Sequence, residues 1–156
     1  MKNLIPFNLF ESYLPPIKDT EIVAATLIGE AGGEEDKDAM KAVLNVLQNR
    51  AKIKGTSAAG EALRPEQFSM WNDATTGVKV RTDFSQSKIN QVINKHKDHK
   101  KWNEALNLAS TTPKDVTGGA THYYAPKRVK KIPSWEKGWT KTKTIGGHIF
   151  GKDVKF

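Results

Sequence analysis

The stretch Ile22–Glu30 reads IVAATLIGE, an apolar run that ends in one carboxylate and is followed directly by alanine and two glycines. Val23, Leu27 and Glu30 share one helical face, because residues three and four positions apart are neighbours on a helix. Val23 and Leu27 require burial, so Glu30 is expected to point toward the interior or the wall of a cleft. The stretch therefore predicts a buried helix with a half-buried carboxyl group at its end.

Burial would give Glu30 either a chemical or a structural role. A carboxyl group removed from water has its charged form disfavoured, so its pKa rises. A group that keeps its proton near neutral pH is suited to general acid catalysis, and the glycines that follow leave room for a substrate. The alternative is a helix-end glutamate paired with a nearby Lys or Arg, since structural ion pairs also perturb pKa values.

Two further helical regions follow the first helix, which is expected over residues 19–30. Residues 34–55 open with acidic side chains, continue with an apolar stripe at helical spacing and end at a glycine, which predicts a second helix. Residues 86–110 carry a third helical pattern, which a kink near a Lys/His run could interrupt.

The rest of the chain has a different character. Glycine and proline residues interrupt the segment 55–85, which predicts irregular structure there. Glycines, threonines and aromatic residues dominate residues 115–151, which predicts loops and short strands, with one strand expected over 145–150. Together these patterns predict an α+β fold that is mainly helical and has a small β-containing part.

Length and composition fit one globular domain. The chain has 156 residues, of which 37% are hydrophobic and 27% charged, and this excludes a largely disordered protein. Residues 1–18 are expected to form an arm before a single domain over 19–156. The absence of cysteine excludes disulfides and a thiolate nucleophile. No apolar run is long enough to span a bilayer, and the N-terminal residues are too interrupted for a signal-peptide core.

The formal net charge of +8 favours polyanionic partners: nucleic acid, an anionic membrane or an acidic bacterial envelope. Basic residues are concentrated in the C-terminal half, for example over 95–101 and 127–131. A solvated helix face and a basic loop explain these two runs equally well.

Three segments combine aromatic rings with amides and hydroxyls: 67–71 (QFSMW), 117–124 (TGGATHYY) and 133–135 (PSW). Aromatic rings stack on the apolar faces of sugars, while short polar groups fix the hydroxyls. A small aromatic core under loops is the alternative for each segment. The candidate sugar-binding residues are Gln67, Ser69, Trp71, Thr121, Tyr123 and Trp135.

A metal site is not expected, and neither is a cofactor. The two histidines, His122 and His148, could hold zinc together with a carboxylate, but no His-Glu-x-x-His is present and the histidines are far apart in the sequence. They are expected to brace loops as supporting residues, and Glu34 is expected to cap or charge the second helix. Ser69 lacks the Gly-x-Ser-x-Gly context of a serine hydrolase nucleophile.

Six segments in order resemble the SleB-type cell-wall hydrolases, the spore-cortex-lytic group that also occurs among phage lysis proteins. These segments are 28–34 (IGEAGGE), 43–50 (VLNVLQNR), 67–71, 115–123 (DVTGGATHY), 133–135 and 145–150 (IGGHIF). The resemblance implies a lysozyme-like fold with a larger α-lobe and a small β-lobe, acting on peptidoglycan with Glu30 as the acid/base.

The chain departs from the family pattern in two ways. Gly32 stands where the family often has arginine, so any contact of that arginine is missing. The export signal and the separate peptidoglycan-binding domain of spore enzymes are also not expected here. The chain therefore resembles a phage endolysin, expected to be a monomer in the host cytoplasm before its release to the wall, where acidic envelope polymers could attract it.

The resemblance favours a lytic transglycosylase, which needs one carboxylate to cleave between N-acetylmuramic acid and N-acetylglucosamine and close a 1,6-anhydro ring. A muramidase is the first alternative, and it requires a second carboxylate, for which Glu34, Glu66 and Asp73 are the candidates. The second alternative is a binding module for cell wall, or for nucleic acid through Lys100 and Lys101, although nucleic acid is not the expected partner.

Overall fold

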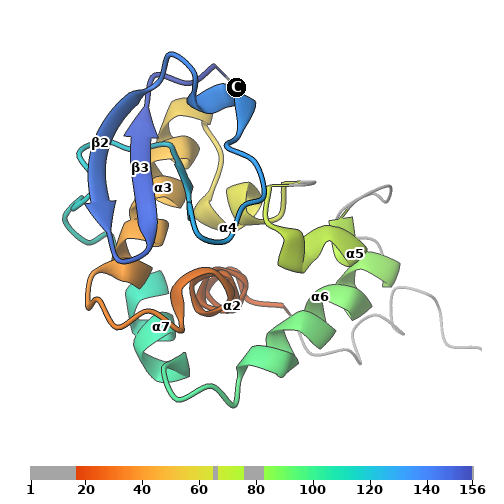
Figure 1. The fold of residues 1–156 in the computed structure, drawn as a ribbon. Helices are drawn as coiled ribbons and strands as arrows, with labels where there is room; N and C mark the ends of the chain where they lie inside the picture. Colours follow the sequence, from red (N-terminus) through yellow and green to blue (C-terminus); the bar gives the residue numbers. More distant parts are fainter. Residues whose placement is uncertain (1–16, 65–66, 76–82, 156) are drawn as a thin grey trace, which may run out of the picture.

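The computed structural model describes residues 17–64, 67–75 and 83–155 (Figure 1). All but the last two residues of the predicted arm therefore lie outside the described part. The elements are α2 (Asp19–Ala31), α3 (Ala39–Lys54), α4 (Ala58–Ala62), η1 (Ser69–Trp71), α5 (Asn72–Thr75), α6 (Asp83–His96), α7 (Trp102–Ala109), β1 (His122–Tyr124), η2 (Ser134–Glu136), β2 (Thr140–Ile145) and β3 (His148–Lys152). The fold is thus α+β and mainly helical, as predicted, with six α-helices and one three-stranded sheet among the described residues.

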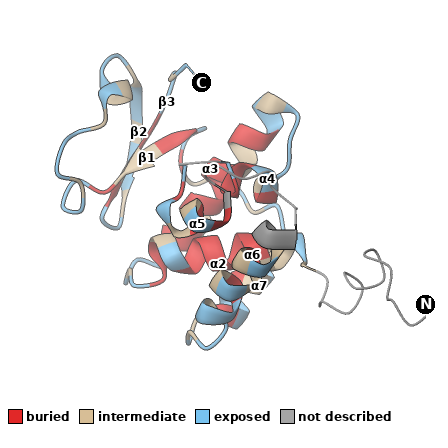
Figure 2. Cartoon of the chain, turned by 90° about the vertical axis from the view of Figure 1, so that its right-hand side faces the viewer, coloured by how far each residue is buried: buried red, intermediate tan, exposed pale blue. Residues whose placement is uncertain are grey.

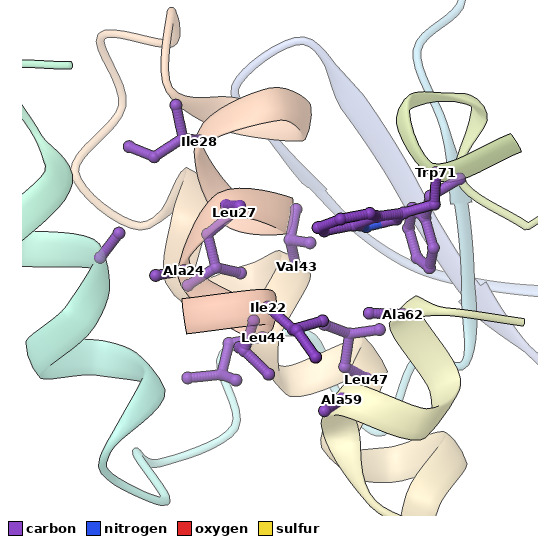
Figure 3. Close-up of a cluster of buried hydrophobic side chains, with 14 of the residues drawn as sticks. Ile22, Ala24, Leu27, Ile28, Val43, Leu44, Leu47, Ala59, Ala62 and Trp71 are labelled. Atoms are coloured by element: carbon purple, nitrogen blue, oxygen red, sulfur yellow. The ribbon is translucent and has the colours of Figure 1, made fainter. Parts of the chain in front are cut away.

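Helix α2 is the centre of the helical part. Every residue from 22 to 28 is buried, because α3, α4, α6 and α7 all contact this helix. Figure 3 shows Ile22 and Leu27 of α2 beside Val43 and Leu47 of α3, with the Trp71 indole in the same cluster. The burial expected for Val23 and Leu27 is confirmed.

Helix α3 contacts both parts of the fold. Its Leu44 and Leu47 belong to the main core, whereas Ala42 and Val46 form a second cluster with Ala120 and Phe150. Figures 1 and 2 show the sheet at one end of the molecule, next to α3 and away from α6. The predicted end of this helix is confirmed, since Gly55 adopts a left-handed φ of 68° after Lys54.

The start of the second helix was predicted too early. Residues 34–38 form turns before α3 rather than its first turn. The Asp36 carboxylate accepts hydrogen bonds from the backbone N–H groups of Asp38 and Gly146, at 2.8 and 3.3 Å. These acidic residues therefore cap a loop and contact the sheet.

The sheet is antiparallel, with β3 between β1 and β2. The single strand predicted over 145–150 is wrong: Ile145 ends β2, Gly146 and Gly147 form the turn, and His148 begins β3. Gly146 has a φ of 57°, a conformation that favours glycine.

The third helical region is two helices, because turns over residues 97–101 separate α6 from α7. The predicted interruption at the Lys/His run is confirmed. The irregular structure predicted over 55–85 contains three short helical segments, α4, η1 and α5. No helix in the described ranges combines the length and the apolarity that a membrane crossing requires.

Candidate active site

Glu30 lies in the last turn of α2, half-buried, and its carboxylate accepts a hydrogen bond from the Tyr123 hydroxyl. Burial raises the pKa of Glu30 above its ordinary value of 4.5, while the hydrogen bond from Tyr123 and the positive charge of Arg128 oppose that rise. Burial thus favours the protonated form of Glu30, which is the form that general acid catalysis requires.

Tyr123 comes from β1, where it pairs with Phe150 of β3. Its ring is 5.2 Å from that of His148 and 5.3 Å from that of Phe150, measured between centroids. Burial and the neighbouring Glu30 charge raise the pKa of Tyr123 well above 10. The phenol therefore stays protonated and acts as a permanent hydrogen-bond donor to Glu30.

A cavity of about 400 Å³ opens at this pair. Its described lining comes from α2, α3, the segment after α4, β1, η2 and the residues after β3. The lining residues are Glu30, Arg50, Lys54, Arg64, Gln67, Phe68, His122, Tyr123, Trp135, Val154 and Lys155. Five predicted site residues, Glu30, Gln67, His122, Tyr123 and Trp135, therefore line one cavity.

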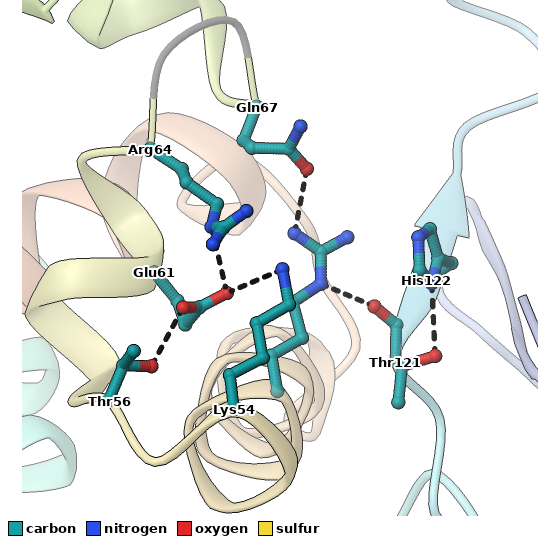
Figure 4. A network of polar contacts seen from close by, with 8 residues as sticks. Lys54, Thr56, Glu61, Arg64, Gln67, Thr121 and His122 are labelled. Carbon is teal, nitrogen blue, oxygen red and sulfur yellow. Dashed lines mark hydrogen bonds and ion pairs between the residues drawn. The ribbon is translucent and has the colours of Figure 1, made fainter. Parts of the chain in front are cut away.

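Arg50 joins the α3 wall of this cavity to β1. Its Nε donates to the Thr121 carbonyl oxygen at 2.5 Å, and its Nη1 donates to the Gln67 side-chain oxygen at 2.9 Å. Burial lowers the pKa of Arg50. Thr121 is itself buried, and its hydroxyl lies 2.9 Å from His122 Nδ1. The predicted polar residues Gln67 and Thr121 thus fix the cavity wall (Figure 4).

The His122 side chain is held among aromatic and cationic groups. Its ring lies 5.0 Å from Trp135, and the Trp135 ring lies 5.2 Å from Trp139. Burial, Arg50 and Lys54 lower the pKa of His122 to about 4, so the imidazole is neutral at physiological pH. Trp135, half-exposed, presents an aromatic surface to the cavity, which suits sugar stacking.

Five predicted residues do not line this cavity, and Thr121, described above as the acceptor for Arg50, is one of them. Trp71 is fully buried in the core, and its indole N–H donates to Thr26 Oγ1 at 3.0 Å, so the structure gives it a packing role instead of a sugar-facing surface. Ser69 is exposed in η1. Glu34 and His148 meet beside the β2–β3 turn, with Glu34 Oε1 3.9 Å from His148 Nδ1.

The described candidates for a second carboxylate, Glu34 and Asp73, do not line this cavity, although Arg128 interacts with both Glu34 and Glu30. Glu34 Oε1 lies 3.6 Å from Arg128 Nη2, and Asp73 lines a separate cavity with Met70 and Lys88. Glu66 lies outside the described residues. Among the described residues that line the cavity, Glu30 is the single carboxylate. No group of three or more potential metal-ligating side chains occurs in the described part of the chain.

Comparisons with known proteins show the family and the fold of the chain. Residues 34–151 match a protein family described as Cell Wall Hydrolase. The fold is similar to the catalytic domain of the germination-specific lytic transglycosylase SleB from Bacillus anthracis, at 22% identity and a TM-score of 0.54, over 89% of this chain and all of that one.

The catalytic domain of the Bacillus cereus SleB protein is similar at 23% identity, also with a TM-score of 0.54, over 86% of this chain and 89% of that one. The curated proteins include no match. The family match begins after Glu30, and the role of that residue is inferred from its burial, its hydrogen bond from Tyr123 and its place in the cavity wall.

Proposed function

Because the chain belongs to the Cell Wall Hydrolase family, we propose that it is a lytic transglycosylase that cleaves peptidoglycan between N-acetylmuramic acid and N-acetylglucosamine. The observation that carries this proposal is the single carboxylate in the described lining of the cavity. A hydrolytic glycosidase uses a pair of carboxylates about 5–9.5 Å apart, whereas an intramolecular ring closure can use one residue for both proton transfers.

In the proposed first step, protonated Glu30 gives its proton to the glycosidic oxygen. The bond from the muramyl C1 to this oxygen breaks, N-acetylglucosamine leaves with a free hydroxyl, and positive charge develops on C1. The carboxylate that forms remains hydrogen-bonded to the Tyr123 hydroxyl, which stabilises its negative charge beside C1.

In the second step, the Glu30 carboxylate removes the proton from the muramyl C6 hydroxyl. The C6 oxygen attacks C1, the 1,6-anhydro ring closes, and Glu30 is protonated again. No water is consumed. The environment of Glu30 suits both steps, because burial favours its acid form and the Tyr123 hydrogen bond favours its base form.

The proposed architecture is lysozyme-like. Helices α2 to α7 would form the larger lobe and β1 to β3 the smaller one, with the cavity at their junction. Two observations support this assignment: Glu30 and Tyr123 come from the helical and the strand part respectively, and Trp135 lies in the cavity wall.

Digestion of purified peptidoglycan, followed by mass spectrometry of the soluble fragments, tests the reaction. The wild-type protein should release fragments that are lighter by one water than hydrolysis products, and Glu30→Gln should lower the rate by about 10³-fold or more. Glu34→Gln and Asp73→Asn are matched controls that each remove one carboxylate and should retain activity.

Reducing-end products, together with a severe loss in either control, would replace this reaction with that of a muramidase. If no product forms with any variant, the protein is a binding module and Glu30 has a structural role.

We further propose a lysis role of the endolysin type, on the resemblance to phage lysis proteins. Production of the chain in bacterial cytoplasm should leave cells intact until the inner membrane is permeabilised. Lysis without permeabilisation would contradict this role.

A further inference from the structure

The cavity that holds Glu30 is strongly cationic. Arg50, Lys54, Arg64 and Lys155 all line it, and Glu30 is the only acid among its described lining residues. General acid catalysis at Glu30 does not require four positive charges. They would instead be expected to recognise an anion, because charge-assisted hydrogen bonds are about twice as strong as neutral ones.

One buried acid behind the wall orders two of these cations. Glu61, only 1% exposed, lies 3.8 Å from Lys54 Nζ and 3.5 Å from Arg64 Nε, and its second oxygen accepts from Thr56 Oγ1 at 2.7 Å (Figure 4). A single carboxylate cannot balance four cations.

The hydrogen bonds that Arg50 donates to Thr121 and Gln67 end on uncharged oxygens, so the negative charge that acts on Arg50 from behind the wall is that of Glu61, which Lys54 and Arg64 share. Burial is the main cause of the lowered pKa of His122, and the positive charges of Arg50 and Lys54, which also line the cavity, lower it further.

The sugar rings of peptidoglycan are neutral, and its carboxylates are carried on the lactyl group of muramic acid and on the stem peptide attached there. We propose that Arg50, Lys54, Arg64 and Lys155 form an anion subsite that binds a carboxylate of this muramyl substituent while the ring is held at Glu30. This inference rests on the proposed function. The subsite would select muramic acid over N-acetylglucosamine and fix which ring is cleaved.

Binding of defined tetrasaccharides of alternating N-acetylglucosamine and N-acetylmuramic acid, measured by calorimetry, tests the subsite. The Glu30→Gln variant is used, so that nothing is cleaved. Three forms are compared: the free lactyl acid, the neutral lactyl methylamide, and the form with a stem peptide. At least one acidic form should bind about tenfold more tightly than the methylamide, a difference of about 1.4 kcal/mol.

Lys155→Gln and Arg64→Gln, each added to Glu30→Gln, should reduce this preference several-fold and leave the affinity for the methylamide unchanged. Lys155 is exposed, so its replacement does not endanger folding, and Lys54 still pairs with Glu61 when Arg64 is changed. Lys100→Gln is the matched control, because it removes the same charge from an exposed position outside the cavity lining.

The two acidic forms distinguish the source of the carboxylate. Preference for the free acid assigns the lactyl group, and preference for the peptide form assigns the stem peptide. Equal affinity for all three forms, no measurable binding of any form, or equal losses in Lys100→Gln would overturn the subsite. A preference that persists in a protein that yields no anhydro product would overturn the transglycosylase and keep the subsite.

Discussion

At the scale of single residues, Glu30 and Tyr123 each alter the protonation of the other. The Tyr123 hydrogen bond lowers the pKa of Glu30 against the larger effect of burial, and the Glu30 charge raises the pKa of Tyr123. The Tyr123 hydroxyl therefore keeps its proton and remains the donor, whereas Glu30, the acceptor, is the group that titrates. The pH dependence of the reaction should report on Glu30.

Replacement of Tyr123 by Phe should move the alkaline limb of the kcat/KM profile to higher pH. The variant keeps the ring and loses a hydrogen bond that favours the charged carboxylate, so the pKa of Glu30 rises further. The maximal rate should fall by about a hundredfold, as for other lost charge-stabilising donors. Tyr124→Phe is the control and should leave the limb in place. An alkaline limb that stays put or moves to lower pH in Tyr123→Phe would contradict the assigned pair.

Glu30→Gln should stabilise the protein at neutral pH. The folded state binds the Glu30 proton more tightly than the unfolded chain, so stability falls as the pH rises from about 4.5 through the raised pKa. The neutral amide avoids this loss, with an expected gain of about 0.5–2 kcal/mol at pH 8 that disappears near pH 4. Urea unfolding at both pH values measures it, and a variant less stable at pH 8 would count against the buried carboxylate.

The sequence identified Glu30 as a candidate site residue but not Arg50, although the same helical-face argument applies to both residues. Val43, Leu47 and Arg50 follow a single helical face, just as Val23, Leu27 and Glu30 do. An arginine in the last turns of a helix is also expected because it interacts favourably with the helix dipole, so Arg50 did not stand out as a functional residue. The sequence could not show that the partners of Arg50 are Gln67 and Thr121, which come from distant segments.

At the scale of elements, α2 is unusual in being buried on nearly every side. Thr26 is the polar residue inside it, and its hydroxyl donates to the Ile22 carbonyl at 2.8 Å while accepting from the Trp71 indole N–H. This hydroxyl therefore links the central helix to η1.

Thr26→Val should cost about 1–3 kcal/mol of stability, because it keeps the shape but removes the buried hydrogen bond between the Trp71 N–H and the Thr26 hydroxyl. Since Trp71 is a core residue, the KM for peptidoglycan fragments should not change. Chemical denaturation and steady-state kinetics measure the two quantities. A rise in KM at full stability would restore Trp71 as a sugar-binding residue.

Gly151→Ala should destabilise the sheet by about 1–3 kcal/mol. A Cβ at this position in β3 would lie 2.4 Å from the Trp139 ring and 2.8 Å from the Thr140 carbonyl oxygen. Gly33→Ala is the matched control, since a Cβ there meets nothing within 4 Å. Thermal melts should separate the two variants by several degrees, and equal melting temperatures would contradict the close approach of Trp139 to β3.

The elements themselves were predictable where one pattern ran long enough. The buried run of α2 and the glycine after α3 are strong local signals. Residues 145–150 read as one apolar strand because Ile145 and Ile149 flank two glycines, and only pairing with β1 and β2 shows that those glycines form a turn. The acidic residues 34–38 resemble a helix start, but they are drawn into contacts with the sheet.

At the scale of the whole molecule, two lysines of the basic run 95–101 link the α6–α7 turn to α2 and to the loop that follows α2. Lys101 Nζ donates to the Glu34 carbonyl oxygen at 2.8 Å, and Lys97 Nζ lies 3.1 Å from a Glu21 carboxylate oxygen. Part of the basic run 95–101 is therefore used inside the fold. The remaining excess of the +8 charge is available for an acidic partner.

Binding to whole cell walls should weaken as the salt concentration rises. Exposed charges act over a Debye length that shrinks from about 10 Å at 0.1 M salt to about 3 Å at 1 M. Sedimentation of Glu30→Gln with purified walls should show several-fold less bound protein at the higher salt. Walls stripped of acidic polymers are the control and should bind less at low salt. Salt-independent binding would mean that the net charge has no part in attachment.

The order of the strands also sets when the enzyme can first act. Strand β3 lies at the centre of the sheet, yet it follows β1 and β2 in the chain. Ribosomes add residues from the N-terminus at about 5–20 per second, so Glu30 and every helix emerge before the strand that pairs with Tyr123. A translation product that stops before His148 has the acid but lacks the strand beside its partner. A chain that ends before His148 is therefore expected to be inactive even on purified peptidoglycan.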